Sequence, residues 1–235
     1  MKYLLRPDKD RWHKQDSMKK SAYAFVPHQT NFGELCGMAD DVVYPGKGFG
    51  MHPHENMEIS TIVISGSQAH RDNTGSEGVI SGNSVQTMSA GTGIMHSEYN
   101  ASDVEPFQSF QIWVYPKVMG VKPRHENFTY EAVEKLNKIL LTLSPDRREG
   151  TAFINQDAFF SVSKLLKGNT VEYKMNRATN GVYVHCATGS VKVDDYTLRA
   201  GDAIGAYDGD VVTICALSDA DLIFVEVPMQ RGVNV

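Results

Sequence analysis

Short apolar stretches bounded by turn residues recur along most of the chain. They are rich in Val, Ile, Thr and aromatic residues, and Gly, Asn and Asp separate them, which is typical of an antiparallel barrel or sandwich. The sequence therefore predicts an all-β protein. The first series of stretches covers residues 59–64, 78–80, 85–88 and 107–115, and the second covers residues 158–166, 170–175, 182–186, 190–193, 202–206, 211–216 and 222–227.

A polar segment separates the two series. Residues 116–137 contain Pro123 early and a short helical pattern at 130–136, so we expect a linker there. The predicted division gives an N-terminal domain at 1–122 and a C-terminal domain at 123–235. A chain of this length can bury a core in each of two such domains.

The most specific chemical signal is two short pairs of residues that bind metals. The first pair is His52 and His54, and the second is His96 and Glu98, with one residue between the members of each pair. Side chains at i and i+2 of a strand point to the same face, so two paired strands would bring three imidazoles and a carboxylate together. Such a set suits iron, copper, nickel or zinc and leaves positions open for a substrate or oxygen. The sequence predicts a metal site.

Other patterns carry less weight. The glycine-rich runs before the two pairs lack the residue order of nucleotide-binding loops. His185 has no partner two residues away, and we expect a hydrogen-bonded core histidine there rather than a ligand. Cys36, Cys186 and Cys215 show no repeated spacing, which favours buried thiols in a reducing compartment over a disulfide framework.

The charge and hydropathy of the chain limit which binding partners are expected. The net charge is -5, and Lys and Arg are spread along the chain, so a nucleic acid is not expected to bind directly. No signal peptide is visible in the polar first residues, and no run approaches the roughly 20 apolar residues of a membrane span. We therefore expect a cytoplasmic protein that contacts no membrane. The sequence leaves the oligomeric state open, and a monomer is the simplest expectation for two β-domains packed on each other.

Three motifs resemble the pirin family of bicupins. Residues 48–58 read GFGMHPHENME, residues 88–100 read MSAGTGIMHSEYN and residues 111–114 read QIWV. The similarity runs through nearly the whole chain and is strongest to the short bacterial pirins that act as quercetin 2,3-dioxygenases. The resemblance implies two tandem cupin barrels of the jelly-roll type. It also implies that the N-terminal barrel holds one divalent metal and the C-terminal barrel none.

The resemblance further implies that the metal ligands are His52, His54, His96 and Glu98. Fe(II) is the ion it favours, and nickel, manganese, copper or zinc also suit these ligands. Many other cupins use a carboxylate close behind the His-x-His pair, and Glu58 stands near that place. We expect Glu58 to orient a histidine instead. In the second half, Met175 and Arg177 stand where the first half has its histidine pair, which agrees with a barrel that binds no metal.

The function implied is the opening of the heterocyclic ring of flavonols such as quercetin by dioxygen, with release of carbon monoxide. Glu98 is the predicted proton acceptor. Two alternatives stay open: an iron-binding redox sensor or regulatory protein that acts through a protein partner, and a closed structural zinc site. A flat aromatic substrate requires an apolar pocket. Its candidate lining residues are Phe49, Met51, Met95, Phe110, Ile112 and Val114.

Overall fold

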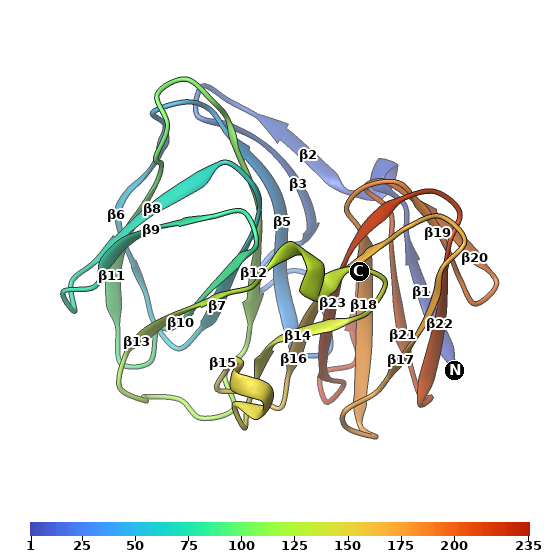
Figure 1. The fold of residues 1–235 in the computed structure, drawn as a ribbon. Coiled ribbons are helices and arrows are strands. Elements are labelled where there is room, and N and C mark those ends of the chain that lie inside the picture. The colour runs from blue at the N-terminus through green and yellow to red at the C-terminus, as the bar shows by residue number, and fades with distance from the viewer.

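The computed structural model describes residues 1–235 and consists almost entirely of β-strands (Figure 1). Four sheets form two halves, each with one large and one small sheet. Three short 3-10 helices, η1 (Asp8–Asp10), η2 (Ala132–Lys135) and η3 (Arg148–Gly150), complete the secondary structure. None of the helices is long and apolar enough to cross a membrane.

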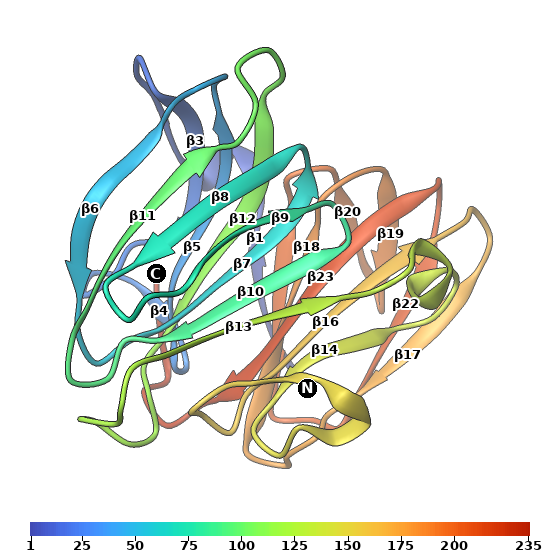
Figure 2. The same cartoon turned by 60° about the vertical axis from the view of Figure 1, so that its left-hand side comes forward.

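The N-terminal half is an open-mouthed barrel. Its large sheet has the strand order β13-β10-β7-β12-β5-β3-β2, and its small sheet has the order β6-β11-β8-β9. Turning the molecule brings the small sheet forward (Figure 2). The strands of the large sheet are β2 (Trp12–Gln15), β3 (Lys19–Phe25), β5 (Leu35–Val43), β7 (Glu58–Ser65), β10 (Ser84–Ser89), β12 (Phe107–Val114) and β13 (Arg124–Thr129). Those of the small sheet are β6 (Gly48–His54), β8 (Ser67–Asp72), β9 (Glu77–Ser81) and β11 (Ile94–Asn100).

The C-terminal half repeats this plan. Its large sheet has the order β1-β21-β18-β23-β16-β14-β15, and its small sheet has the order β17-β22-β19-β20. The large sheet contains β1 (Lys2–Arg6), β14 (Leu140–Ser144), β15 (Ala152–Phe153), β16 (Phe159–Leu165), β18 (Asn180–Cys186), β21 (Ala203–Tyr207) and β23 (Ala220–Pro228). The small sheet contains β17 (Thr170–Lys174), β19 (Ser190–Val193), β20 (Tyr196–Arg199) and β22 (Val211–Ala216).

Both ends of the chain join the sheet of the other half. β1 pairs with β21 of the C-terminal sheet, from Lys2 opposite Tyr207 to Arg6 opposite Ala203. The last strand, β24 (Val233–Asn234), pairs with β4 (Asn31–Phe32), which in turn pairs with β5 of the N-terminal sheet. The division of the chain near residue 122 stays a prediction.

The segment expected to be a linker contains a strand. Residues 124–129 form β13, which pairs antiparallel with β10, with Arg124 opposite Ser89 and Thr129 opposite Ser84. The linker prediction was wrong here because an edge strand can be polar on most positions and still complete a sheet through its backbone. The helical pattern at 130–136 is one 3-10 turn, capped by the side chains of Glu131 and Glu134.

The two large sheets face each other across the main hydrophobic core. The interior of the C-terminal barrel is a second apolar core, whereas the N-terminal barrel has only two small apolar clusters and buries many polar side chains. This contrast places the chemistry in the N-terminal barrel. The main core includes Phe25, Phe32, Phe110 and Ile112 from the N-terminal half, and Phe160, Tyr183, Ile223 and Val225 from the C-terminal half.

His185 lies at this core between the two large sheets. Its ring contacts Phe110 at a centroid distance of 4.7 Å. Burial lowers its pKa well below the usual value, so the ring is neutral. Neither ring nitrogen has a hydrogen-bond partner, which differs from the hydrogen-bonded core histidine expected from the sequence.

Candidate metal centre

Three histidines meet where β6 pairs with β11. The register places His96 directly opposite His52, and Ile94 opposite His54. The ring centroids are 4.4 Å apart for His52 and His96, 4.9 Å for His54 and His96, and 4.8 Å for His52 and His54. One ring nitrogen from each histidine lies within 4.8 Å of the other two. The structure thus brings together the three imidazoles that the sequence singled out.

A glycine and a bulge permit this close pairing. A Cβ at Gly48 would lie 2.2 Å from the carbonyl oxygen of Glu98, so only glycine fits at this point of the pairing between β6 and β11. The register shifts between His96 and Glu98, and such a bulge changes the direction of the side chains beside it. Backbone geometry therefore sets where these ligand candidates point.

The rings of His54 and His96 are neutral at pH 7 and carry free lone pairs. Burial, aided by the neighbouring rings, lowers the pKa of His96 to about 3 and that of His54 to about 4. His52 donates from Nδ1 to the carbonyl oxygen of Gly50 at 2.8 Å, which leaves its Nε2 free. Neutral imidazoles held in this way fit a divalent metal ion.

Glu98 is buried and held by two amides. Gln68 donates from Nε2 to Oε1 at 2.6 Å, and Gln111 donates from Nε2 to Oε2 at 2.9 Å. Burial raises the pKa of the carboxyl group. Glu98 does not share the tight group of His52 and His54. Its carboxylate lies within 4.8 Å of ring nitrogens of His96 and of a fourth histidine, His70.

Sequence reasoning missed His70. Its signal was the same alternation that revealed the other pairs, since His70 and Asp72 are two residues apart on β8. Both side chains are almost fully buried, with exposed fractions of 1% and 0%.

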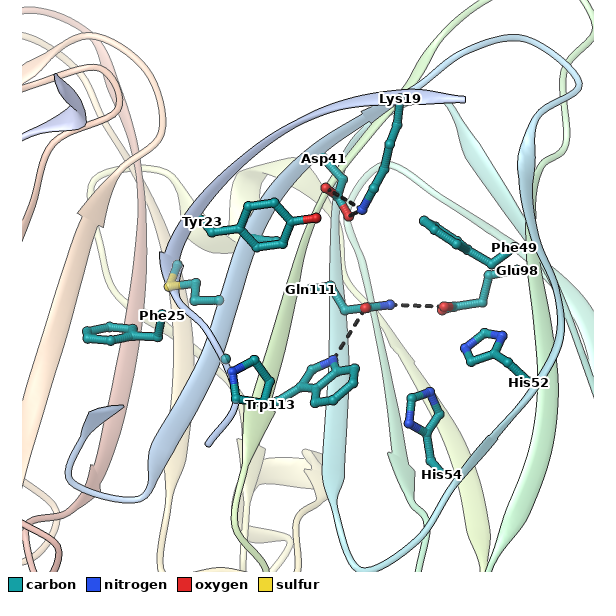
Figure 3. Close-up of a pocket in the computed structure, with 14 residues that line it drawn as sticks. Lys19, Tyr23, Phe25, Asp41, Phe49, His52, His54, Glu98, Gln111 and Trp113 are labelled. Carbon is teal, nitrogen blue, oxygen red and sulfur yellow. Dashed lines mark hydrogen bonds and ion pairs between the residues drawn. The ribbon is translucent and has the colours of Figure 1, made fainter. Parts of the chain in front are cut away.

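A pocket of about 270 Å³ opens onto the histidines (Figure 3). His52, His54 and Glu98 point into it from one side, and Tyr23 and Trp113 lie on the other. The edge of the Trp113 ring meets His54 at a centroid distance of 5.0 Å. The full lining is Lys19, Tyr23, Phe25, Pro27, Gly37, Met38, Ala39, Asp41, Phe49, His52, His54, Glu98, Gln111 and Trp113.

Of the six expected lining residues, only Phe49 is correct. Met51 and Met95 are exposed to solvent, by 50% and 36%. The remaining three, Phe110, Ile112 and Val114, lie in the core between the large sheets. Side chains alternate along β12, so the apolar positions face that core, and the alternate face carries Gln111 and Trp113 into the pocket. The prediction assigned the wrong face of β12 to the pocket.

An ion pair lies at the far end of the pocket. Lys19 donates to both carboxylate oxygens of Asp41, at 2.9 and 2.8 Å, and Ser21 donates its hydroxyl to the same carboxylate at 2.6 Å. The Lys19 Nζ also lies 4.7 Å from the centroid of the Phe49 ring. The pocket therefore has an apolar middle, a histidine cluster at one end and a polar pair at the other.

Glu58 does not orient a histidine. Its Oε2 accepts hydrogen bonds from the hydroxyl of Ser89 at 2.8 Å and from the backbone N–H of Asn155 at 3.0 Å, and no hydrogen bond joins it to an imidazole. Burial raises its pKa to about 7. Because Asn155 belongs to the segment before β16, Glu58 connects the two halves of the molecule rather than supporting the histidine cluster.

The corresponding region of the second barrel is built differently. Met175 belongs to the apolar core of that barrel, where the rings of Tyr173 and Phe224 stack at 5.1 Å. The buried carboxylate of Glu226 accepts a hydrogen bond from the Tyr173 hydroxyl at 2.8 Å and two from Asn176. These contacts hold the loop that follows β17.

Fold and site together define a bicupin with a histidine cluster in its N-terminal barrel. The pirin family model matches residues 7–114, and the model of the quercetinase C-terminal cupin domain matches residues 141–227. A quercetin 2,3-dioxygenase of Escherichia coli K12 is 34% identical over 219 residues, which cover 93% of this chain and 91% of the relative. The chain belongs to the pirin family.

Other similar proteins agree with this assignment. A pirin-like protein of Caulobacter vibrioides is 36% identical over 92% of this chain and 92% of its own length. The crystal structure of the bacterial pirin YhhW of Escherichia coli, in complex with nickel(II), has a TM-score of 0.89 and 31% identity and covers 97% of this chain and 99% of that chain. The predicted bicupin fold and the likeness to quercetin 2,3-dioxygenases are confirmed.

Proposed function

We propose that this protein is a metal-dependent dioxygenase that opens the heterocyclic ring of a flavonol such as quercetin and releases carbon monoxide. The observation that carries the proposal is the pocket of about 270 Å³, which runs between aromatic side chains and ends on the histidine cluster. A flat aromatic substrate in this pocket would place one edge against the histidines. Relatives named quercetin 2,3-dioxygenase support the choice of substrate class.

His52, His54, His96 and Glu98 are the proposed ligands of one divalent ion. The three imidazoles and one buried carboxylate suit the ions between manganese and zinc, and Fe(II) is our first choice. Nickel is the ion named for the similar bacterial pirin. When bound, the ion supplies a Lewis acid for the deprotonated substrate hydroxyl and, if it is redox-active, an electron path to dioxygen.

Glu98 is the proposed base for the 3-hydroxyl of the flavonol. Its carboxylate lines the pocket next to His52, within reach of a substrate edge that contacts the histidines. Gln68 and Gln111 fix both of its oxygens, so the carboxylate is already oriented before the substrate binds. Trp113 and Phe49 line the same pocket, and the bound substrate would displace water from it.

The test is oxygen uptake with quercetin by apoprotein reloaded separately with Fe(II), Ni(II), Mn(II), Cu(II) and Zn(II). Carbon monoxide is measured in the same samples. We expect turnover with at least one redox-capable or nickel ion, and loss of turnover in His52→Ala. His13→Ala is the matched control, because His13 is an exposed histidine hydrogen-bonded to the backbone of Asp8, outside the cluster. If the fully loaded protein takes up no oxygen with any of these ions, the proposal is refuted.

A second candidate is an iron-binding redox sensor that acts through a protein partner. Two exposed methionines favour it: Met51 on β6 and Met95 on β11, which lies opposite Pro53. Exposed methionines are frequent at surfaces that bind other proteins. This candidate predicts metal binding without quercetin turnover. Cytoplasmic location and the monomeric state remain predictions of the sequence.

A further inference from the structure

β8 lies on the opposite side of β11 from β6 and carries His70, the fourth histidine of the site. The register pairs His70 with Glu98, and Asp72 with His96. Residues opposite each other on antiparallel strands point to the same face, so all four side chains point into the barrel. The His70 ring centroid lies 5.4 Å from that of His96.

Asp72 fixes the proton of His70 on one nitrogen. The Nε2 of His70 donates to Oδ2 of Asp72 at 3.1 Å. The other oxygen of Asp72 accepts from the backbone and hydroxyl of Thr74, at 2.8 and 2.6 Å, and from the backbone of Ser76 at 3.2 Å. Because the hydrogen bond to Asp72 occupies Nε2, Nδ1 is the ring nitrogen of His70 that is left for a ligand.

This nitrogen has no hydrogen-bond partner in the protein. The Nδ1 atom of His70 is fully buried and accepts no hydrogen bond, and the same is true of both ring nitrogens of His96. A buried polar atom without a partner is unfavourable for the folded protein. An imidazole whose other nitrogen donates to a carboxylate is the usual form of a metal-binding histidine. His70 is thus arranged as a ligand is.

The ring of His125 packs against one face of the His70 ring. Its imidazole stacks on His70 at 4.4 Å with an angle of 16° between the planes, and its Nδ1 bonds to the hydroxyl of Ser76 at 3.0 Å. This stacking restricts rotation of the His70 ring. A ligand that is fixed in orientation loses less entropy when it binds an ion.

We propose that His70, His96 and Glu98 form an inner cation position, adjoining the outer group of His52, His54 and His96. The ligand atoms of the inner group lie within 4.8 Å of one another, a spacing that a single ion with bonds of about 2 Å can bridge with small side-chain shifts. The expected ligand is a divalent ion such as Co(II), Ni(II) or Zn(II). With the ligands proposed above for the outer ion, the two positions share His96 and Glu98. The proposal rests on the metal-binding role given above to His96 and Glu98.

Metal binding without substrate tests it. Apoprotein of the double variant His52→Ala/His54→Ala lacks the outer position, and calorimetric titration with Co(II) measures what remains, with the Co(II) absorption spectrum as the readout of imidazole coordination. We expect one ion per chain. Adding His70→Phe, which keeps the ring stack on His125, should weaken this binding tenfold or more. His125→Phe in the same double variant is the matched control and should leave the affinity within threefold.

The outcomes separate this proposal from the proposed function. Circular dichroism establishes that each variant folds, and His70→Gln, whose amide keeps the bond to Asp72, replaces His70→Phe if that variant does not fold. If the double variant binds no Co(II), or binds it equally well without His70, the inner position is refuted. If the wild type binds no divalent ion at all, both proposals fail. If the wild type and His70→Phe alone bind equally and the double variant does not, only the outer position stands.

Discussion

Gln111 connects the pocket wall to the buried carboxylate of Glu98. Its Nε2 donates to Glu98 Oε2 at 2.9 Å, while its own Oε1 accepts a hydrogen bond from the indole of Trp113 at 3.3 Å. Trp113, which lines the pocket, and Glu98, the proposed base, are thus joined through one amide. Movement of either side chain requires this amide to change its bonds.

Gln111→Leu should lower kcat for quercetin roughly ten- to hundredfold, because a hydrogen bond to a charged group contributes about 1.5–3 kcal/mol. The measurement is steady-state oxygen uptake, with metal content determined in parallel. Gln108→Leu is the matched control, since Gln108 lies on the same strand and bonds to Asp40 instead. An equal loss in both variants would show that the effect is a general one on β12.

Trp113→Ala should raise the KM for quercetin roughly tenfold with a smaller change in kcat, because the indole lines the pocket and contributes aromatic contact to a flat ligand. Binding of quercetin to the metal-free protein, followed by fluorescence, gives an independent affinity. Trp12→Ala removes an indole that is 56% exposed and should leave KM unchanged. A fall in kcat alone would contradict the role in binding.

Glu58 should make the stability of the protein depend on pH. Burial raises its pKa from 4.5 to about 7, so the folded state binds the proton more tightly than the unfolded chain. Stability from this group is therefore fully present below pH 4.5 and falls as the pH rises toward 7. The variant Glu58→Gln has no titrating group at this position, so its stability should not fall in this way as the pH rises.

From pH 4.5 to 8, the free energy of unfolding of Glu58→Gln should gain on the wild type by on the order of 3 kcal/mol. Urea denaturation at a series of pH values measures the difference. Glu55→Gln, a change at an exposed glutamate nearby, should follow the wild type at every pH. A difference between Glu58→Gln and the wild type that does not change with pH would rule out this explanation.

Gly91→Ala should destabilise the fold by more than about 2 kcal/mol, because this residue has a φ of +48° and a Cβ there would lie 1.9 Å from the carbonyl oxygen of Val121. The turn it forms precedes β11, which carries His96. Gly78→Ala is the control, since nothing lies within 4 Å of its Cβ and its φ is not positive, and it should change stability by less than about 0.5 kcal/mol. Thermal and urea unfolding of both variants provide the comparison.

The sequence predicted the strands of the second half well because apolar residues fill both faces of strands such as β18 and β23. It missed β5, where Asp40 and Asp41 interrupt the apolar run. Asp41 is buried and bonds to Lys19, and the half-buried Asp40 bonds to Gln108. Such partners come from distant parts of the chain, and local patterns do not contain them.

At the site, the spacing of His52, His54 and His96 predicted their meeting because alternation along a strand is a local property. The role of His70 depends on which strand lies beside β11, and this is a property of the fold. The prediction of the pocket lining was wrong for a related reason: one face of β12 packs in the core between the large sheets, and the other faces the pocket. Alternation separates Phe110 from Gln111 but does not say which of them faces the barrel interior.

The pairing of β1 with β21 bears on how the chain is made. β1 leaves the ribosome well before residues 203–207, its partner in the sheet, have been synthesised, and β24 reaches β4 later still. At about 5–20 residues per second, β1 waits for tens of seconds without a partner. An unpaired strand is prone to associate with other chains, and the polar residues Lys2 and Arg6 at its ends oppose such association during that interval.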